Sequence, residues 1–146
     1  MENKVILLVE DNARDEMLTL RALKKSNIVN EVIVVRDGVE ALDYFFGPDS
    51  RVGHVRNTMP QLVLLDLKLP KLDGLSVLKA LRADERTRVL PIVIFTSSSE
   101  EEDMIKSYDL GANSYVRKPV DFDRFLEATK HLGLYWLILN EVVPTK

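Results

Sequence analysis

Side chains of opposite charge follow several short apolar runs in this sequence. The set contains three carboxylates, one hydroxyl and one ammonium group: Glu10, Asp11, Asp66, Thr96 and Lys118. Carboxylate oxygens are ligands that suit Mg²⁺, together with water and phosphate oxygens. Because two carboxylates about 4 Å apart repel each other by roughly 4 kcal/mol at an effective dielectric constant near 20, a cluster of three needs a cation. If these residues meet, they can hold a divalent cation beside Lys118 and bind a phosphate.

Five short runs rich in Val, Ile and Leu are the elements that would bring these residues together. We predict strands at Val5–Val9, Val32–Val35, Leu62–Leu65, Ile92–Phe95 and Ser114–Val116. The gaps between them leave room for the crossover helices that parallel strands require. Runs such as Leu62–Leu65 are apolar on both faces, which is typical of a parallel sheet covered by helices on each side. The predicted fold class is therefore α/β, with a doubly wound five-stranded parallel sheet.

Helices are predicted between the strands and after the last one. Their ranges are 13–25, 38–46, 74–83, 100–110 and 122–139. A capping residue three positions before a Glu marks two of the helix starts, at Asp37 and at Ser99. Gly47 and Gly111 mark two helix ends, where a left-handed residue is favoured. In such a fold, ligands bind at the carboxyl ends of the strands, which is where the charged residues described above are placed.

The composition limits the classes of function. The 146 residues include no cysteine, which excludes disulfides, cysteine-ligated metals and thiol catalysis. The net charge is only −3, so we predict neither a nucleic-acid partner nor a membrane partner. No apolar run approaches the roughly 20 residues that cross a bilayer, and the N-terminus lacks a signal-peptide pattern. We predict a single cytoplasmic domain over 1–146, with 126–146 as an extended C-terminal helix and tail.

The pattern resembles the response regulator receiver family of two-component signalling over residues 5–125. The resemblance rests on the five residues of the cluster and on Asp37-Gly38, Pro70, Asp73-Gly74, Gly111-Ala112 and Pro119. It implies a flavodoxin-like receiver fold with the strand order 2-1-3-4-5. It also implies that Asp66 is the phosphorylation site, with Thr96 and Lys118 as its catalytic partners. Such a chain catalyses only its own phosphorylation and dephosphorylation and is not a conventional enzyme.

The same resemblance implies a metal site and a conformational switch. Mg²⁺, which Mn²⁺ or Ca²⁺ can replace, is expected to bind Glu10, Asp11, Asp66 and the backbone carbonyl of Lys68. Phosphorylation is expected to draw Thr96 inward and to turn Tyr115 toward the vacated space. In the family, the position of Lys68, two residues after the acceptor, tunes the rate of dephosphorylation.

Three segments look like those of regulators that are paired with bacterial phytochrome kinases. They are the long loop at 47–60, the stretch 83–88 and the C-terminal stretch 133–141. The implied partner is a sensor histidine kinase, in particular a bacteriophytochrome. The two histidines of this chain, His54 and His131, are placed away from the strand ends, so the phosphodonor histidine is expected to come from that partner.

The C-terminal segment predicts a homodimer. Residues 134–139 are apolar all around a helix, and a surface helix cannot bury every face against its own domain. An unburied aromatic patch is typical of a partner surface. The expected interface uses the fifth strand and the fifth helix, with Tyr115, Phe122, Leu134, Tyr135, Trp136 and Ile138. The alternative is a tail that folds back over the edge of the sheet.

Two other classes of function fit part of the pattern. An enzyme of the haloacid-dehalogenase class also uses a strand-end Asp, a hydroxyl, a lysine and Mg²⁺. Its general acid is a second Asp two residues after the nucleophile, where this sequence has Lys68, and its nucleophile follows the first strand, whereas Asp66 follows the third. A receiver-like module that takes no phosphate is the other alternative, and the complete acidic cluster argues against it.

Overall fold

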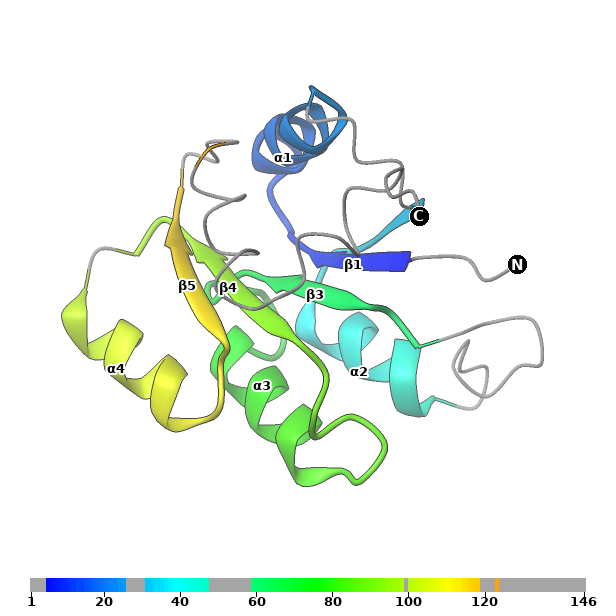
Figure 1. The fold of residues 1–146 in the computed structure, drawn as a ribbon, viewed down its shortest axis with the longest axis vertical. Coiled ribbons are helices and arrows are strands. Elements are labelled where there is room, and N and C mark those ends of the chain that lie inside the picture. Colours follow the sequence, from blue (N-terminus) through cyan, green and yellow to red (C-terminus); the bar gives the residue numbers. More distant parts are fainter. Residues whose placement is uncertain (1–4, 26–30, 48–58, 99, 119–122, 124–146) are drawn as a thin grey trace, which may run out of the picture.

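A computed structural model describes residues 5–25, 31–47, 59–98, 100–118 and 123 of the chain. They contain a five-stranded parallel sheet with the order β2-β1-β3-β4-β5 (Figure 1). The strands are β1 (Val5–Val9), β2 (Glu31–Val35), β3 (Leu62–Leu65), β4 (Ile92–Thr96) and β5 (Ser114–Arg117). The predicted fold class and strand order are therefore confirmed, and β2, β4 and β5 are each one residue longer than predicted.

Helices cover both faces of this sheet. They are α1 (Ala13–Lys25), α2 (Gly38–Phe46), α3 (Gly74–Ala83) and α4 (Glu101–Asp109). α2 and α3 pack on the face that presents Leu7 and Val63, whereas α1 packs through Leu23 on the face that presents Ile6 (Figure 1). Because β1, β3 and β4 are buried on both faces, their sequences are apolar, apart from Thr96 at the end of β4. Of the fifth helix predicted at 122–139, all residues but Asp123 lie outside the described residues.

Side chains at the loop ends explain where two helices begin. Asp37 caps α2 by accepting a hydrogen bond from the Glu40 backbone N–H at 2.7 Å. The Glu40 carboxylate accepts from the backbone N–H of Arg36 at 2.9 Å, one residue before the Asp37 N–H that a capping box would use. α4 begins at Glu101, one residue later than predicted, and the predicted capping residue Ser99 is not among the described residues. Ser98 organises this start instead, because its hydroxyl accepts from the Glu100 N–H at 3.2 Å.

The two glycines predicted to end helices differ in conformation. Gly111 has a φ of 105°, so the predicted left-handed conformation is confirmed there. At Gly47 the prediction is wrong, because its φ is −72° and its N–H closes the helix by donating to the Asp43 carbonyl at 2.9 Å. Arg82 of α3 fixes the turn at Gly111 by donating to its carbonyl at 2.9 Å and to the Asn113 side chain at 2.9 Å.

We expect Gly74→Ala to destabilise the chain, because Gly74 lies directly against the backbone that carries Asp66. A Cβ atom at position 74 would lie 2.2 Å from the Asp66 carbonyl oxygen and 2.7 Å from Leu67 Cα. Neither atom can rotate away, so the expected loss in the free energy of unfolding is about 3 kcal/mol. Urea denaturation measures it. Ser76→Ala, an exposed position in the same helix, is the matched control and is expected to change stability by less than about 0.5 kcal/mol; equal stability of the two variants would contradict the prediction.

Candidate functional site

The sheet register brings the two buried carboxylates together. Val9 pairs with Leu65 at the ends of β1 and β3, so the next residues, Glu10 and Asp66, emerge side by side. The Asp66 N–H continues the ladder by donating to the Val9 carbonyl at 3.1 Å. Ligand oxygens of Glu10, Asp11 and Asp66 all lie within 4.8 Å of one another. Glu10 and Asp66 are buried, whereas Asp11 is exposed and leaves one side of the cluster open to solvent.

Lys118 supplies the positive charge of the cluster. Its backbone N–H donates to the Thr96 carbonyl at 2.8 Å, which fixes the residue at the carboxyl end of β5. Its ammonium group donates to Glu10 at 2.6 Å and to Asp66 at 3.1 Å. The predicted convergence of these residues from β1, β3 and β5 is therefore present.

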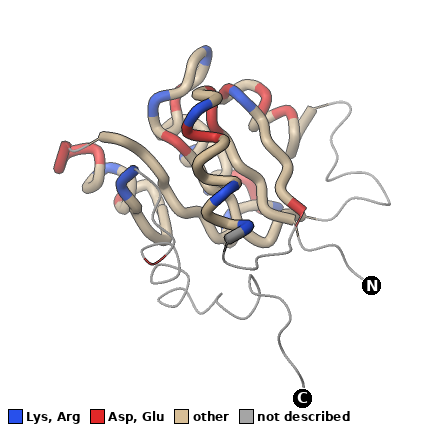
Figure 2. The backbone as a smooth tube through the Cα atoms, turned by 90° about the horizontal axis from the view of Figure 1, so that it is seen from above, with Lys and Arg blue, Asp and Glu red and all other residues tan. Residues whose placement is uncertain are grey.

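A third carboxylate, which was not among the predicted site residues, also contacts this ammonium. Asp15, in the first turn of α1, accepts from Lys118 Nζ at 3.0 Å. Its position one helical turn after the Glu10-Asp11 pair, on a helix that starts at the same edge of the sheet, was the available signal. Charges elsewhere are mixed, since acidic and basic positions are interspersed along the described backbone (Figure 2).

Burial and charge shift the pKa values at this site in defined directions. Burial raises the pKa of Glu10 to about 7, although the hydrogen bond from Lys118 acts in the opposite direction. Burial by itself lowers the pKa of Lys118, but the hydrogen bond to Glu10 and the charge of Asp66 raise it above its ordinary value. Near neutral pH the ammonium group of Lys118 is therefore charged, and the carboxyl group of Glu10 titrates within the physiological pH range.

Thr96 and Tyr115, the predicted switch residues, both contact the backbone of Ser98. Thr96 is buried at the end of β4, and its hydroxyl accepts from the Ser98 N–H at 3.2 Å. The half-buried Tyr115 on β5 donates its hydroxyl proton to the Ser98 carbonyl at 3.3 Å. A displacement of Ser98 would therefore change the hydrogen bonds of both side chains.

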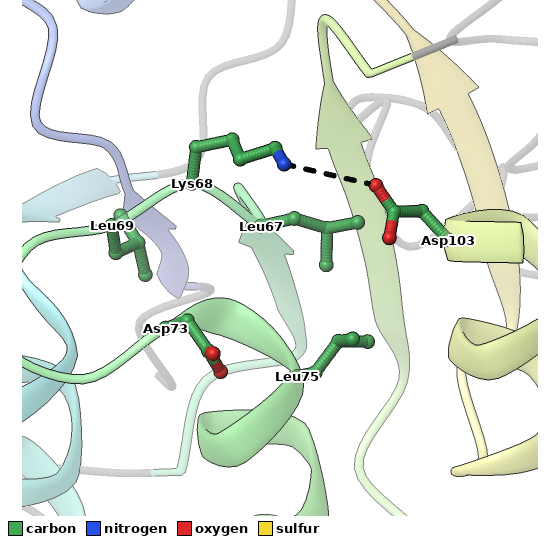
Figure 3. A pocket seen from close by; sticks show the side chains of 6 residues that line it. All are labelled: Leu67, Lys68, Leu69, Asp73, Leu75 and Asp103. Carbon is green, nitrogen blue, oxygen red and sulfur yellow. Dashed lines mark ion pairs between the residues drawn. The ribbon is translucent and has the colours of Figure 1, made fainter. Parts of the chain in front are cut away.

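The Lys68 side chain extends away from the carboxylates. Its N–H donates to Asp66 Oδ1 at 3.4 Å, but its ammonium lies 3.9 Å from Asp103 of α4. Figure 3 shows this pair among the side chains that line a cavity. The cavity has a volume of about 450 Å³. The cavity is lined by Leu67, Lys68, Leu69, Asp73, Leu75 and Asp103. Because the Lys68 side chain is largely exposed, the ion pair contributes little to stability.

The donor set fits a hard divalent cation. Three carboxylates from two strand ends offer oxygen atoms at close range, and oxygen ligands are what Mg²⁺ and Ca²⁺ prefer. Among the described residues, one ammonium contacts the cluster, which leaves the cluster with an excess of negative charge that a cation would offset.

Comparison with known proteins decides the family. The model of the response regulator receiver domain matches residues 6–130. The chain belongs to the response regulator receiver family. It is a receiver of two-component signalling and not a conventional enzyme, so the dehalogenase alternative is set aside.

Several solved receivers are similar over nearly the whole chain. The bacteriophytochrome response regulators RtBRR and AtBRR are 52% and 51% identical, each with a TM-score of 0.82. Both comparisons cover 97% of this chain, with 85% of RtBRR and 100% of AtBRR. Response regulator Rcp1 of Synechocystis is 37% identical over 92% of this chain and 89% of its own length. A structure of Rcp1 is a Mn²⁺-bound form, with a TM-score of 0.71 and 34% identity over 97% of this chain and 99% of that chain.

Several predicted features fall on residues that the structure does not describe. They include residues 48–58 of the loop predicted at 47–60 and five residues of the predicted dimer interface: Phe122, Leu134, Tyr135, Trp136 and Ile138. None of the described helices is long and apolar enough to cross a lipid bilayer.

Proposed function

We propose that Asp66 accepts the phosphoryl group of this receiver from a sensor histidine kinase. The observation that carries the proposal is the position of Asp66: it is buried at the end of β3, within the acidic cluster and 3.1 Å from the ammonium of Lys118. Asp11 belongs to the same cluster but is exposed, and Glu10 is bound more tightly to Lys118, at 2.6 Å. Asp66 is therefore a buried carboxylate that Lys118 holds in place within the same cluster as the exposed Asp11.

In the proposed reaction, a carboxylate oxygen of Asp66 attacks the phosphorus atom of phosphohistidine on the kinase. The bond between phosphorus and the imidazole nitrogen breaks as the new oxygen–phosphorus bond forms, and its electron pair stays on the imidazole. The product is an acyl phosphate on Asp66. Because phosphoryl transfer depends mainly on positioning and on neutralising the phosphoryl oxygens, the roles of Lys118 and Thr96 are to bind these oxygens by charge and by a hydroxyl hydrogen bond.

The proposed metal is Mg²⁺, which Mn²⁺ or Ca²⁺ can replace. Glu10, Asp11, Asp66 and the backbone carbonyl of Lys68 would hold it. When bound, the cation supplies positive charge to the phosphoryl oxygens. The Mn²⁺-bound form of Rcp1 supports this assignment.

We expect the affinity for Mg²⁺ to fall as the pH is lowered through about 7. The pKa of Glu10 is raised to about 7, so below that pH the carboxyl group must lose a proton before it can bind a cation. The dissociation constant then rises by up to about tenfold per pH unit. Calorimetry at pH 6 and pH 8 measures both the affinity and the proton release. Glu10→Gln is expected to remove most of this pH dependence, and Asp11→Ala to weaken binding at both pH values; a wild-type affinity that is equal at pH 6 and pH 8 would contradict the prediction.

The output switch follows from the contacts of Ser98. A phosphoryl group on Asp66 would draw the Thr96 hydroxyl toward its oxygens, breaking the bond from the Ser98 N–H. Tyr115, which donates to the carbonyl of the same residue, would then turn inward. The surface of α4 and β5 would change as a result.

We propose a bacteriophytochrome as the partner kinase. We also propose that this chain meets the kinase in the cytoplasm. The support is the similarity of this chain to RtBRR and AtBRR, which are bacteriophytochrome response regulators. The test is transfer of labelled phosphate to this chain, with Mg²⁺, from an autophosphorylated bacteriophytochrome and from an unrelated histidine kinase. We expect faster transfer from the phytochrome, with the label on Asp66 by mass spectrometry. Equal rates from both kinases would remove the phytochrome assignment, and label on another residue would remove Asp66.

We also propose a homodimer through β5 and the C-terminal segment. Ile105 and Tyr108 of α4, next to β5, expose about half of their surface, and the sequence adds the apolar residues 134–139. Truncation after Gly133 is expected to give a monomer that still accepts phosphate. Analytical ultracentrifugation of the full and truncated chains measures this; a full-length chain that sediments as a monomer at high concentration, phosphorylated or not, would contradict the dimer.

A further inference from the structure

Lys118 has no free hydrogen-bond donor. A lysine ammonium carries three N–H groups. In this site they face three different carboxylates, on Glu10 at 2.6 Å, Asp15 at 3.0 Å and Asp66 at 3.1 Å. A phosphoryl oxygen that binds Lys118 must therefore compete with a carboxylate that already occupies a donor.

The three carboxylates differ in how easily they can leave. The side chains of Glu10 and Asp66 are 1% and 8% exposed, so either one would lose its counter-ion inside the protein. The Asp15 side chain is 32% exposed, and water can replace the ammonium as its partner. Because an unpaired buried charge is far more costly than a hydrated one, Asp15 is the acceptor that Lys118 gives up most readily.

Asp15 is not needed to keep Lys118 in place. The Lys118 side chain is 6% exposed and bonded to Glu10 at the shortest of the three distances. The first turn of α1 does not depend on the Asp15 side chain either, because Asn12 caps it by accepting from the Asp15 backbone N–H at 2.9 Å. Removal of the Asp15 carboxylate therefore frees a donor without displacing the ammonium or the helix.

We propose that Asp15 competes with the phosphoryl group for Lys118, and so weakens phosphoryl binding at Asp66. This inference rests on the proposed role of Asp66 as acceptor. In the resting chain Asp15 occupies one ammonium donor and adds a negative charge beside the site. When a phosphoryl group arrives, Asp15 is released into water and Lys118 turns the freed donor toward a phosphoryl oxygen.

The test uses beryllofluoride, which binds an aspartate as a phosphoryl group does, at saturating Mg²⁺ and with ¹⁹F NMR detection. We expect Asp15→Ala to lower the dissociation constant of beryllofluoride by roughly fivefold, the size expected for loss of one partly exposed ion pair. Asp15→Asn, which keeps the shape and a weaker acceptor, is expected to fall between wild type and Asp15→Ala. Glu16→Gln is the matched control, because Glu16 carries the same charge in the same helical turn but pairs with Arg36 at 2.8 Å.

Two further measurements separate this role from a structural one. The ¹H–¹⁵N signal of the Lys118 ammonium is expected to change in Asp15→Ala and to stay unchanged in Glu16→Gln. The affinity for Mg²⁺ alone is expected to fall far less in Asp15→Ala than in Asp11→Ala, because Asp15 is not placed as a metal ligand. A fall as large as that of Asp11→Ala would make Asp15 a ligand and overturn the proposal.

The remaining outcomes are also decisive. If the wild type binds beryllofluoride and Asp15→Ala binds it equally or more weakly, Asp15 is not a competitor and only this inference fails. If Glu16→Gln tightens binding as much as Asp15→Ala, a general charge effect explains the result and the inference fails again. If the wild-type chain binds no beryllofluoride at all, the proposed function of Asp66 fails with it.

Discussion

Asp66→Asn is expected to accept no phosphoryl group from a histidine kinase that phosphorylates the wild-type chain. The amide keeps the size of the carboxylate but is not a nucleophile, so the acyl phosphate cannot form. The variant is expected to stay folded, because it removes one of the negative charges gathered around Lys118 and leaves the hydrogen bond to Glu10 intact. Transfer of labelled phosphate, followed over time on gels, measures the loss, and circular dichroism checks the fold.

The matched control for this variant is Asp73→Asn. Asp73 lies seven residues further on, at the start of α3, where its carboxylate accepts from the Ser76 N–H at 2.8 Å. Asparagine caps helices as well as aspartate does, so this substitution is expected to leave both fold and phosphorylation unchanged. Phosphorylation of Asp66→Asn at the wild-type rate would show that another residue is the acceptor.

Lys118→Met is expected to destabilise the metal-free chain by about 3 kcal/mol at pH 8, because it leaves Glu10 and Asp66 buried without their counter-ion. The loss is expected to be smaller at pH 6. Removal of the lysine raises the pKa of Glu10 further above about 7, so the carboxyl group is protonated at pH 6 and its burial costs less. Urea denaturation in the presence of a chelator measures both values.

Added Mg²⁺ is expected to restore part of the stability of Lys118→Met, since a bound cation takes over the neutralising role of the ammonium. Lys106→Met is the control, because Lys106 forms an exposed pair with Glu102 at 3.6 Å on α4. Its expected effect is below about 0.5 kcal/mol at either pH. Equal losses in the two variants, or a loss in Lys118→Met that grows as the pH falls, would contradict the electrostatic account of the site.

The amino-acid sequence alone was sufficient to predict the strands of the sheet and most of the charged residues at their carboxyl ends. Runs such as Leu62–Leu65 are apolar on both faces, which is typical of a parallel strand covered on both sides, and Asp66 follows such a run directly. The strand order that makes β1 and β3 neighbours was implied by the family resemblance; given that order, the side chains of Glu10 and Asp66 meet because neighbouring parallel strands end at the same edge. Caps such as Asp37 were equally readable, since their hydrogen bonds span three residues.

Only the tertiary structure decided which side chains share Lys118 and which do not. Asp15 and Lys118 are 103 positions apart, and their contact depends on how α1 sits against the end of β5. Lys68 is two residues from Asp66, yet its ammonium turns to Asp103 on α4. Hydrophobic periodicity and turn chemistry act over a few residues, so they can be predicted from the sequence. The direction of a long charged side chain depends on which charges the packed layers bring within its reach, and this is decided only by the tertiary structure.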